Sequence, residues 1–394
     1  MKKILEKITR GVLFSSSMVT SLTVLLVVFF LFREGIGIFN RNAVEEHHVI
    51  AIHPDNPIKE LTSQQVMDIF NQDITDWKEV GGSEAFIQLA SVDDVANQYT
   101  EEELGEGYAN LPQLIEDYIL ANPGVIIYFT DNYIKEGFKG KLVPLHKIGF
   151  SEFLFGIDWF PTAQPAGRYG VWPLVMGTLW VSLGAILLAL PIGLITAIYL
   201  SEVAKPAIRN LFKPVIELLS GIPSVVYGFF GLVVVVPLIQ KLFRLDVGET
   251  ALAGSLILAL MALPTVITIA EDALRTTPRA LKEASLALGA SHWQTIFRVV
   301  VPYAKSGIIA AVILGIGRAV GETMAVLMVT GNASVVPSTF LEPVRTIPAT
   351  IAAELGEAAY GGTHFKALFA LGIILFLITF GFNLAVEAVK TRRK

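Results

Sequence analysis

The longest uncharged stretch of this chain constrains its fold most strongly. From Tyr169 to Ser201, 33 consecutive residues carry no charged side chain. About 20 mostly apolar residues are enough to span a bilayer as a helix. The stretch therefore predicts an interfacial segment around Trp172 and Pro173, followed by a membrane helix. The whole chain is 53% hydrophobic and 16% charged, whereas soluble domains carry about 25% charged residues. We therefore expect a membrane protein.

Five further apolar segments bring the number of expected spans to six. They are Gly11–Phe32, Leu218–Gln240, Thr250–Ala270, Tyr303–Met328 and Ala367–Val386. A cleaved signal peptide is the alternative for the first segment. Its apolar run is long for a signal peptide and no A-x-A site follows it, so an uncleaved helix is favoured.

The charged residues predict the orientation of these spans. Basic side chains cluster in the N-terminal tail, after the second span (Lys205, Arg209 and Lys213), after the fourth span (Arg275 to Arg298) and at the C-terminus (Lys390, Arg392, Arg393 and Lys394). With six spans, all four clusters lie on one side. By the positive-inside rule both termini are cytoplasmic. Residues 33–168 hold nine Lys and Arg against 22 Asp and Glu, a net charge of −13, and are expected outside.

These patterns predict three regions. Residues 1–39 form the cytoplasmic tail and first membrane helix, residues 40–165 an external acidic α/β insertion, and residues 166–394 a core of five membrane helices with a cytoplasmic loop at 275–302. The chain has no cysteine and no G-x-x-x-x-G-K-[ST] phosphate-binding loop. We therefore expect no enzyme activity, no cofactor or metal of its own and no nucleic-acid binding.

The fifth span contains two charged residues, Arg318 and Glu322. Such charges are disfavoured in a bilayer core, and their i,i+4 spacing predicts that they share one helix face. They could form an ion pair that lets the helix insert. They could instead line a path for an anion, because the arginine fork suits phosphate or carboxylate oxygens. Glu322 could accept a hydrogen bond from a protonated phosphate and would repel sulfate. Thr323 belongs to the same candidate path.

The third span contains a predicted helix break at Gly221 and Pro223. Proline removes a backbone donor, and freed backbone groups of broken membrane helices often face a transport cavity. Ser224 and Tyr227 follow with hydroxyl groups and are candidate path residues. An ordinary proline kink packed by small residues is the alternative.

The connection after the fourth span, 275–302, is too polar to cross a membrane. "RALKEASLALGA" predicts a helix that Gly289 can end, and "SHWQTIFRVVVP" a second amphipathic piece. A plain helix pair at the membrane surface is one interpretation. The spacing of Glu283-Ala284-Ser285, Gly289, Val299 and Val301-Pro302 resembles the EAA-x3-G-x9-I-x-L-P loop of ABC importer permeases. That resemblance implies that Glu283, Ala284, Ser285, Gly289 and Pro302 belong to a coupling helix that docks on an ATPase.

Two further segments extend this resemblance. "GRAVGETMAVLMVTGN" and "SGIPSVVYGFFGL" resemble the fifth-helix and third-helix segments of the phosphate-specific ABC importer permeases, PstC type. The resemblance implies an all-α polytopic protein of the MetI-like permease fold in a bacterial plasma (inner) membrane, and it assigns phosphate translocation to Arg318 and Glu322. It also implies a PstA-like second permease, an extracytoplasmic phosphate-binding protein, and ATPase subunits that bind the ATP and Mg²⁺.

The insertion has its own pattern. "HVIAI" predicts a strand, Thr62 or Ser63 a helix cap, and Trp77 a packed turn closed by Gly81-Gly82. "LTSQQVMDIFNQDITDWKEVGG" resembles part of a type II periplasmic binding protein of the phosphate-binding group. The Arg-x-x-x-Ser-Gly-Thr run with which that group grips phosphate is missing after the glycines. We therefore expect a binding-protein lobe that lacks the phosphate site.

The sequence thus predicts a permease subunit of an ATP-driven phosphate importer. Three alternatives stay open at this stage. The substrate could be another oxyanion, although Glu322 argues against sulfate. The chain could be a membrane receptor that senses phosphate through the insertion, although no signalling domain follows the last helix. The insertion could be a working phosphate receptor fused to its permease, which the missing arginine opposes.

Overall fold

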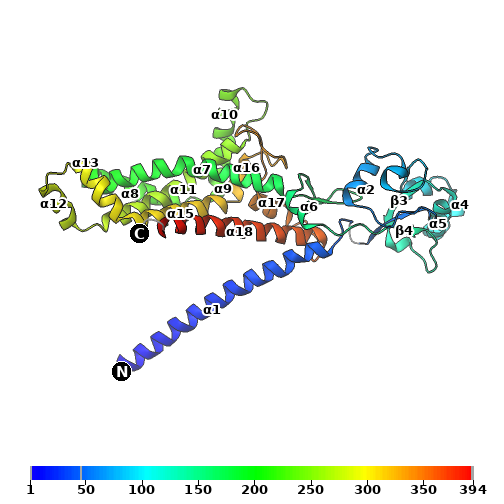
Figure 1. The fold of residues 1–394 in the computed structure, drawn as a ribbon, viewed down its shortest axis with the longest axis horizontal. Coiled ribbons are helices and arrows are strands. Elements are labelled where there is room, and N and C mark those ends of the chain that lie inside the picture. Colours follow the sequence, from blue (N-terminus) through cyan, green and yellow to red (C-terminus); the bar gives the residue numbers. More distant parts are fainter. Residues whose placement is uncertain (1, 45–46, 392–394) are drawn as a thin grey trace. The chain divides into compact units, whose positions relative to one another are not determined.

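The computed structural model describes residues 2–44 and 47–391 and divides into two compact units (Figure 1). The first unit comprises Met1–Val171 and Glu357–Ala370, and the second Trp172–Gly356 and Leu371–Lys394. Arg392, Arg393 and Lys394, on which the predicted basic C-terminus partly rests, lie outside the described residues.

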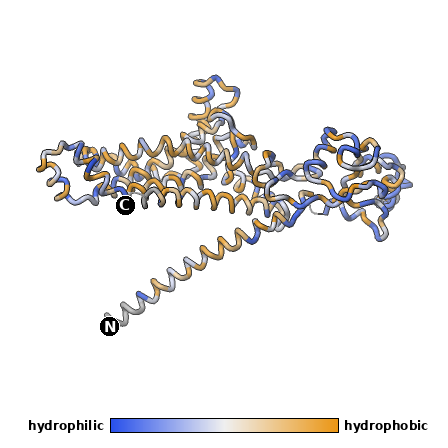
Figure 2. Tube along the Cα trace, viewed as in Figure 1, coloured by the Kyte–Doolittle hydropathy of each residue, from blue (hydrophilic) through white to orange (hydrophobic). Residues whose placement is uncertain are grey.

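Within the described residues, five helical stretches are long and apolar enough to cross a membrane: Thr9–Asn40, Trp172–Val203, Ser224–Phe243, Ala251–Arg275 and Thr363–Ala388. A sixth is obtained if the pair His292–Tyr303 and Lys305–Val320, bent by 70°, is counted as one span. Figure 2 shows these helices as largely hydrophobic and the insertion as largely hydrophilic. Five of the six expected spans are therefore present, and the expected fifth span contributes Lys305–Val320, which is long enough only together with His292–Tyr303 of the predicted loop.

Three local predictions were wrong. Helix α7 (Trp172–Ile198) begins at Trp172 with Pro173 in its first turn, where proline is tolerated, so no separate interfacial segment precedes it. The third span begins at Ser224, because residues Pro206–Ser220 form a separate amphipathic helix, α8. The fifth span is not continuous from Tyr303 to Met328, because α15 (Lys305–Val320) ends before Gly321 and α16 (Met324–Val329) follows.

The second unit is built around α7, α11 (Ala251–Arg275) and α15, which pack against one another. Small residues allow this close packing: a Cβ built on Gly184 would lie 2.3 Å from Ser255 Oγ, and one on Gly315 2.7 Å from Val266. Besides α8 and α16, this unit contains α9 (Ser224–Phe230), α10 (Val236–Phe243), α12 (Arg279–Ala287), α13 (His292–Thr295), α14 (Val301–Tyr303) and α17 (Ile347–Glu354). Helix α18 (Thr363–Thr391) begins in the first unit and continues in the second.

The first unit contains α1 (Lys2–Ile36) and a four-stranded sheet. The sheet has the order β2 (Gln88–Ala90), β3 (Val125–Thr130), β1 (His48–Ile52), β4 (Lys141–Leu142). Strands β1 and β3 are antiparallel with Ile50 opposite Tyr128, whereas β2 and β3 are parallel. Strands β5 (Trp159–Phe160) and β6 (Arg168–Tyr169) form a separate antiparallel pair. The helices near the sheet are α2 (Ser63–Phe70), α3 (Val92–Ala96), α4 (Glu101–Leu104) and α5 (Leu111–Ala121), and α6 (Phe150–Phe155) lies apart from it (Figure 1).

The predicted local structure of the insertion is confirmed. "HVIAI" is β1, and Thr62 caps α2 through a reciprocal capping box with Gln65. Trp77 is fully buried and its Nε1 donates to the Gly124 carbonyl at 2.9 Å. The Gly82 N–H donates to the Trp77 carbonyl at 2.7 Å, which closes the turn.

Candidate functional site

The break in the fifth span separates the two charged residues of the candidate path. Arg318 lies in the last turn of α15, whereas Glu322 lies in the non-helical segment between α15 and α16. The prediction that they share one face of a continuous helix was wrong, because the helix ends between them at Gly321. The structure also places no ion pair between Arg318 and Glu322, both of which it describes in full.

Helix electrostatics accounts for part of this arrangement. The C-terminus of a helix carries partial negative charge and the N-terminus partial positive charge. Arg318 lies at the C-terminal end of α15, and the Glu322 carboxylate accepts a hydrogen bond from the Ala325 N–H in the first turn of α16 at 3.4 Å. Thr323 immediately precedes α16, and its Oγ1 donates to the Gly321 carbonyl at 3.4 Å. Each charge therefore stabilises the helix end at which it lies.

Arg318 is half-buried, and its Nε is buried without a hydrogen-bond partner. Tyr227 lies on α9 of the third span. Tyr227 is buried and its hydroxyl donates to the Leu219 carbonyl at 2.9 Å. A buried guanidinium donor without a partner is available for an anionic ligand.

The predicted break in the third span is confirmed. Helix α8 ends at Ser220, Gly221 follows it, and Pro223 directly precedes α9. Ser224, the first residue of α9, is half-buried. The third and fifth spans approach closely after this break, because a Cβ on Gly228 would lie 3.0 Å from the Ala325 Cα of α16. Two interrupted membrane helices therefore pack against each other beside Arg318.

A cavity of about 480 Å³ adjoins the break in the fifth span. Its lining is mostly apolar and consists of Gly321, Thr323, Pro348, Ile351, Ala352, Leu355, Gly356 and Leu375. Thr323 is the one predicted path residue that lines it. The sequence interpretation missed the contribution of α17, which packs against α7 and α16. An ion pair of 2.6 Å joins Arg345 Nη2, just before this helix, to Glu354 Oε1 at its end. The opposite charges of Arg345 and Glu354, nine residues apart in an apolar segment, could have indicated this ion pair from the sequence.

The loop between α11 and α15 contains the expected helix pair. Glu283 and Ala284 are exposed on α12, whereas Ser285 Oγ lies 3.0 Å from Thr295 Oγ1 of α13 and links the two helices. Gly289 adopts φ +85°, a left-handed conformation that favours glycine. Pro302 lies in the first turn of α14. The exposed large apolar side chains of this loop are Leu281, Leu286, Leu288, Trp293 and Phe297.

Ion pairs connect the end of α11, where this loop begins, to α8. The Glu271 side chain is 2% exposed and lies 2.8 Å from both Arg209 Nε and Lys213 Nζ of α8. Lys213 also lies 2.8 Å from Asp272. Burial lowers the pKa of Lys213, but its hydrogen bonds to Asp272 and Glu271 and their negative charges outweigh this effect and raise the pKa above its ordinary value. The end of α11 is thus tied to α8 by a network of opposite charges.

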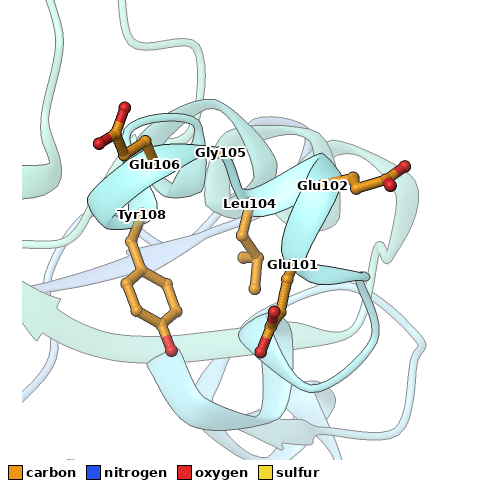
Figure 3. A pocket seen from close by; sticks show the side chains of 6 residues that line it. All are labelled: Glu101, Glu102, Leu104, Gly105, Glu106 and Tyr108. Atoms are coloured by element: carbon orange, nitrogen blue, oxygen red, sulfur yellow. The ribbon is translucent and has the colours of Figure 1, made fainter.

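The insertion contains an acidic hollow rather than an anion site. A cavity of about 390 Å³ is lined by Glu101, Glu102, Leu104, Gly105, Glu106 and Tyr108. In Figure 3, Leu104 and Tyr108 point to the same side as Glu101, while the Glu102 and Glu106 carboxylates diverge. No basic side chain lines this hollow. Its charge repels anions, and the part of the chain that the structure describes holds no group of three or more acidic or histidine side chains placed to bind a metal.

Comparison with protein families matches both parts of the chain. Residues 189–394 match the family described as "Binding-protein-dependent transport system inner membrane component". Residues 12–164 match a family described as "PBP superfamily domain".

Individual relatives match more than half of the chain. The "Probable ABC transporter permease protein YqgH" of Bacillus subtilis is 41% identical over 243 residues, which are 62% of this chain and 78% of that protein. The "Phosphate transport system permease protein PstC" of Mesorhizobium japonicum is 38% identical over 262 residues, which are 62% of this chain and 79% of that protein. A solved structure of the MetNI methionine ABC transporter covers 56% of this chain and 94% of its own, with 22% identity and a TM-score of 0.41.

Proposed function

Because this chain belongs to the family of binding-protein-dependent transport system inner membrane components, we propose that it is the permease subunit of an ATP-driven importer of inorganic phosphate. The names of its PstC relatives support phosphate as the substrate. The observation that carries the proposal is the half-buried Arg318 between two interrupted membrane helices, with a buried guanidinium nitrogen that has no partner.

The proposed substrate path is built from both interrupted spans. Arg318 binds phosphate oxygens through its planar donors, and the half-buried environment strengthens this attraction. Ser224, Tyr227 and Thr323 supply hydroxyl groups along the path. One Glu322 oxygen caps α16, and the carboxylate accepts a hydrogen bond from a protonated phosphate oxygen. This acceptor disfavours sulfate, which is fully deprotonated at neutral pH.

The loop at 275–302 couples this path to a separate ATPase subunit that binds the ATP and Mg²⁺. Its small and apolar exposed residues suit a groove on that subunit, and Leu288 is 89% exposed. Closure of two ATPase subunits moves the coupling helices, and the helix bundles rock around a site near the bilayer midplane. A PstA-like second permease completes the path, and an extracytoplasmic phosphate-binding protein delivers the substrate.

The proposed orientation places both termini and the 275–302 loop in the cytoplasm and residues 33–168 outside. Its support is the distribution of basic residues. We also propose the division into 1–39, 40–165 and 166–394. The outer part of the insertion, a lobe without an anion site, serves as a surface for the binding protein or the second permease.

The test is reconstitution of the complete complex in proteoliposomes. The proposal predicts copurification of a second permease and an ATPase, and uptake of labelled phosphate that requires ATP and the binding protein. Excess sulfate should not compete. Uptake of sulfate or another oxyanion in preference to phosphate would keep the transporter assignment and overturn the substrate. Absence of any ATP-dependent uptake would overturn the assignment itself.

A further inference from the structure

An apolar surface of the first unit has no role in the proposed transport cycle. Four large side chains on and just after α6 are exposed to solvent: Phe150 (65%), Phe155 (61%), Ile157 (64%) and Phe160 (53%). We call these four residues the apolar collar. They fall within 11 consecutive residues of an insertion that is otherwise strongly acidic. Exposed apolar groups this close together mark an interaction surface.

The apolar collar is in contact with the turn that follows the first membrane helix. The turn Gly37–Asn40 follows α1, and its Phe39 ring lies 5.6 Å from the Phe150 ring and 5.7 Å from the Phe153 ring. The Ile148 N–H donates to the Arg41 carbonyl at 3.0 Å. These contacts lie within one unit and fix α6 beside the point where α1 leaves the membrane.

The start of α18 indicates how far the end of α1 lies from the hydrocarbon core of the bilayer. Thr363 Oγ1 donates to the Asn42 carbonyl at 3.3 Å, and the Phe30 and Phe369 rings lie 5.5 Å apart. The apolar part of α18 begins four residues after Thr363, at Ala367. At about 1.5 Å per residue, Asn42 therefore lies about 6 Å beyond the hydrocarbon core. The headgroup layer extends about 5–7 Å beyond that core.

The chemistry of the apolar collar suits this depth. Aromatic side chains are enriched at membrane–water interfaces. Two cations lie close to this point: Arg41 follows the turn after α1, and Lys147 comes just before α6. Lys147 Nζ lies 2.5 Å from Asn40 Oδ1. Cations at this level attract lipid phosphate groups. The exposed apolar surface of α1, including Ile36 at 56% exposure, runs into the same region.

We propose that the apolar collar inserts into the headgroup layer of the bilayer at the end of α1 and anchors the insertion to the membrane surface. The occupant is lipid, because the collar continues the lipid-facing surface of α1 at headgroup depth. This role is independent of the transported substrate.

The absence of cysteine from the chain allows a direct test. Single variants Phe155→Cys and Ile157→Cys carry a nitroxide spin label in the full chain, assembled with its partner subunits in phosphatidylcholine–phosphatidylglycerol nanodiscs. Phe86→Cys is the matched control, because Phe86 is an exposed aromatic residue (80%) of the same insertion, next to the sheet edge rather than α6. The measurement is accessibility to oxygen, which partitions into lipid, and to nickel-EDDA, which stays in water.

We expect labels at positions 155 and 157 to be more accessible to oxygen than to nickel-EDDA, and the label at position 86 to show the reverse. A label at 155 or 157 that behaves like the one at 86 would overturn the proposal. Protection from both reagents would overturn it in favour of a protein partner. Protection that arises only after the binding protein is added would assign the surface to that protein.

Discussion

Lys282 of α12 and Glu202 at the end of the second span form a two-pronged ion pair, with Lys282 Nζ 2.8 Å from each Glu202 oxygen. The Glu202 side chain is 5% exposed, so this contact is largely shielded from water. The Glu202 backbone carbonyl also lies 3.2 Å from His292 Nε2 of α13. One residue therefore attaches both helices of the 275–302 loop to the end of the second span.

Glu202→Gln should uncouple ATP hydrolysis from transport. The substitution leaves Lys282 without its counter-charge in a shielded position, which weakens the attachment of α12. We expect the phosphate transported per ATP hydrolysed to fall by about 10-fold, while the complex still assembles. Lys282→Gln should have the same effect, and Lys241→Gln, which removes an exposed cation of α10, should have none. The measurement is the ratio of uptake to hydrolysis in proteoliposomes.

The double variant Glu202→Lys with Lys282→Glu decides whether the pair itself matters. If the attachment depends on opposite charges, the exchange should restore most of the coupling. A double variant as impaired as the two single variants would show that the ion pair does not transmit the movement.

Gly289→Val should weaken docking of the ATPase. A β-branched residue at φ +85° is strained, so α12 should leave its position or the turn should rearrange. Gly289→Asn is the matched control, because asparagine tolerates the left-handed conformation. We expect the valine variant to lose copurification with the ATPase and the asparagine variant to keep it. Normal copurification and stimulated hydrolysis in the valine variant would show that this loop is not the coupling element. Glu283→Lys tests the same surface by reversing an exposed charge.

Two short helices of the insertion, α3 and α4, should become less stable in acid. Side-chain and backbone hydrogen bonds from Ser91 hold the pKa of Asp94 below its ordinary 3.8, and those from Thr100 hold the pKa of Glu103 below its ordinary 4.5. Because both pKa values are depressed, the stability from these caps is present above the ordinary values and is lost as the pH falls through the depressed ones. Helices α3 and α4 should fray in that range.

Nuclear magnetic resonance titration of the two carboxylates checks this expectation. Ser91→Ala should return the pKa of Asp94 toward 3.8, and Thr100→Ala that of Glu103 toward 4.5. Thr62→Ala is the control, because the partner in its capping box is the uncharged Gln65, and it should move neither pKa. Unchanged titrations in the first two variants would show that the caps do not form in solution.

The insertion expressed alone as residues 47–147 should fold and should not bind phosphate. The range contains the whole four-stranded sheet and its buried residues, and its hollow is lined by carboxylates rather than by an arginine. Circular dichroism reports folding and calorimetry reports binding. Phosphate binding with micromolar affinity would show that the insertion is a working receptor.

Much of the fold could be predicted from local signals. Apolar length located most of the spans, and the cap expected at Thr62 or Ser63 located α2. Pro223 indicated the break in the third span, because proline removes a backbone donor. The break at Gly321 was not predicted, because glycine is common in membrane helices and the surrounding pattern is compatible with one helix.

The contacts that build the site were less predictable. Helix α16 packs closely on α9 at Gly228, and no feature of either segment indicates that pairing. The ion pair between Arg345 and Glu354 did have a signal, the two opposite charges in an apolar segment, which the sequence interpretation did not use. Glu322 was assigned a helix face that depended on an unbroken helix, and the turn at Gly321 changed its surroundings.

Uptake of phosphate by the Arg318→Gln variant tests the central claim most directly. Glutamine keeps hydrogen-bonding groups but removes the charge that offsets the anion in a half-buried site. We expect uptake in proteoliposomes to fall by about 100-fold or more, by analogy with the loss of one preorganised donor, at normal levels of the assembled complex. Glu322→Gln should be milder, because the amide oxygen can still accept a hydrogen bond from a protonated phosphate oxygen. Near-normal uptake by Arg318→Gln would contradict the account and leave Arg318 with a structural role at the end of α15.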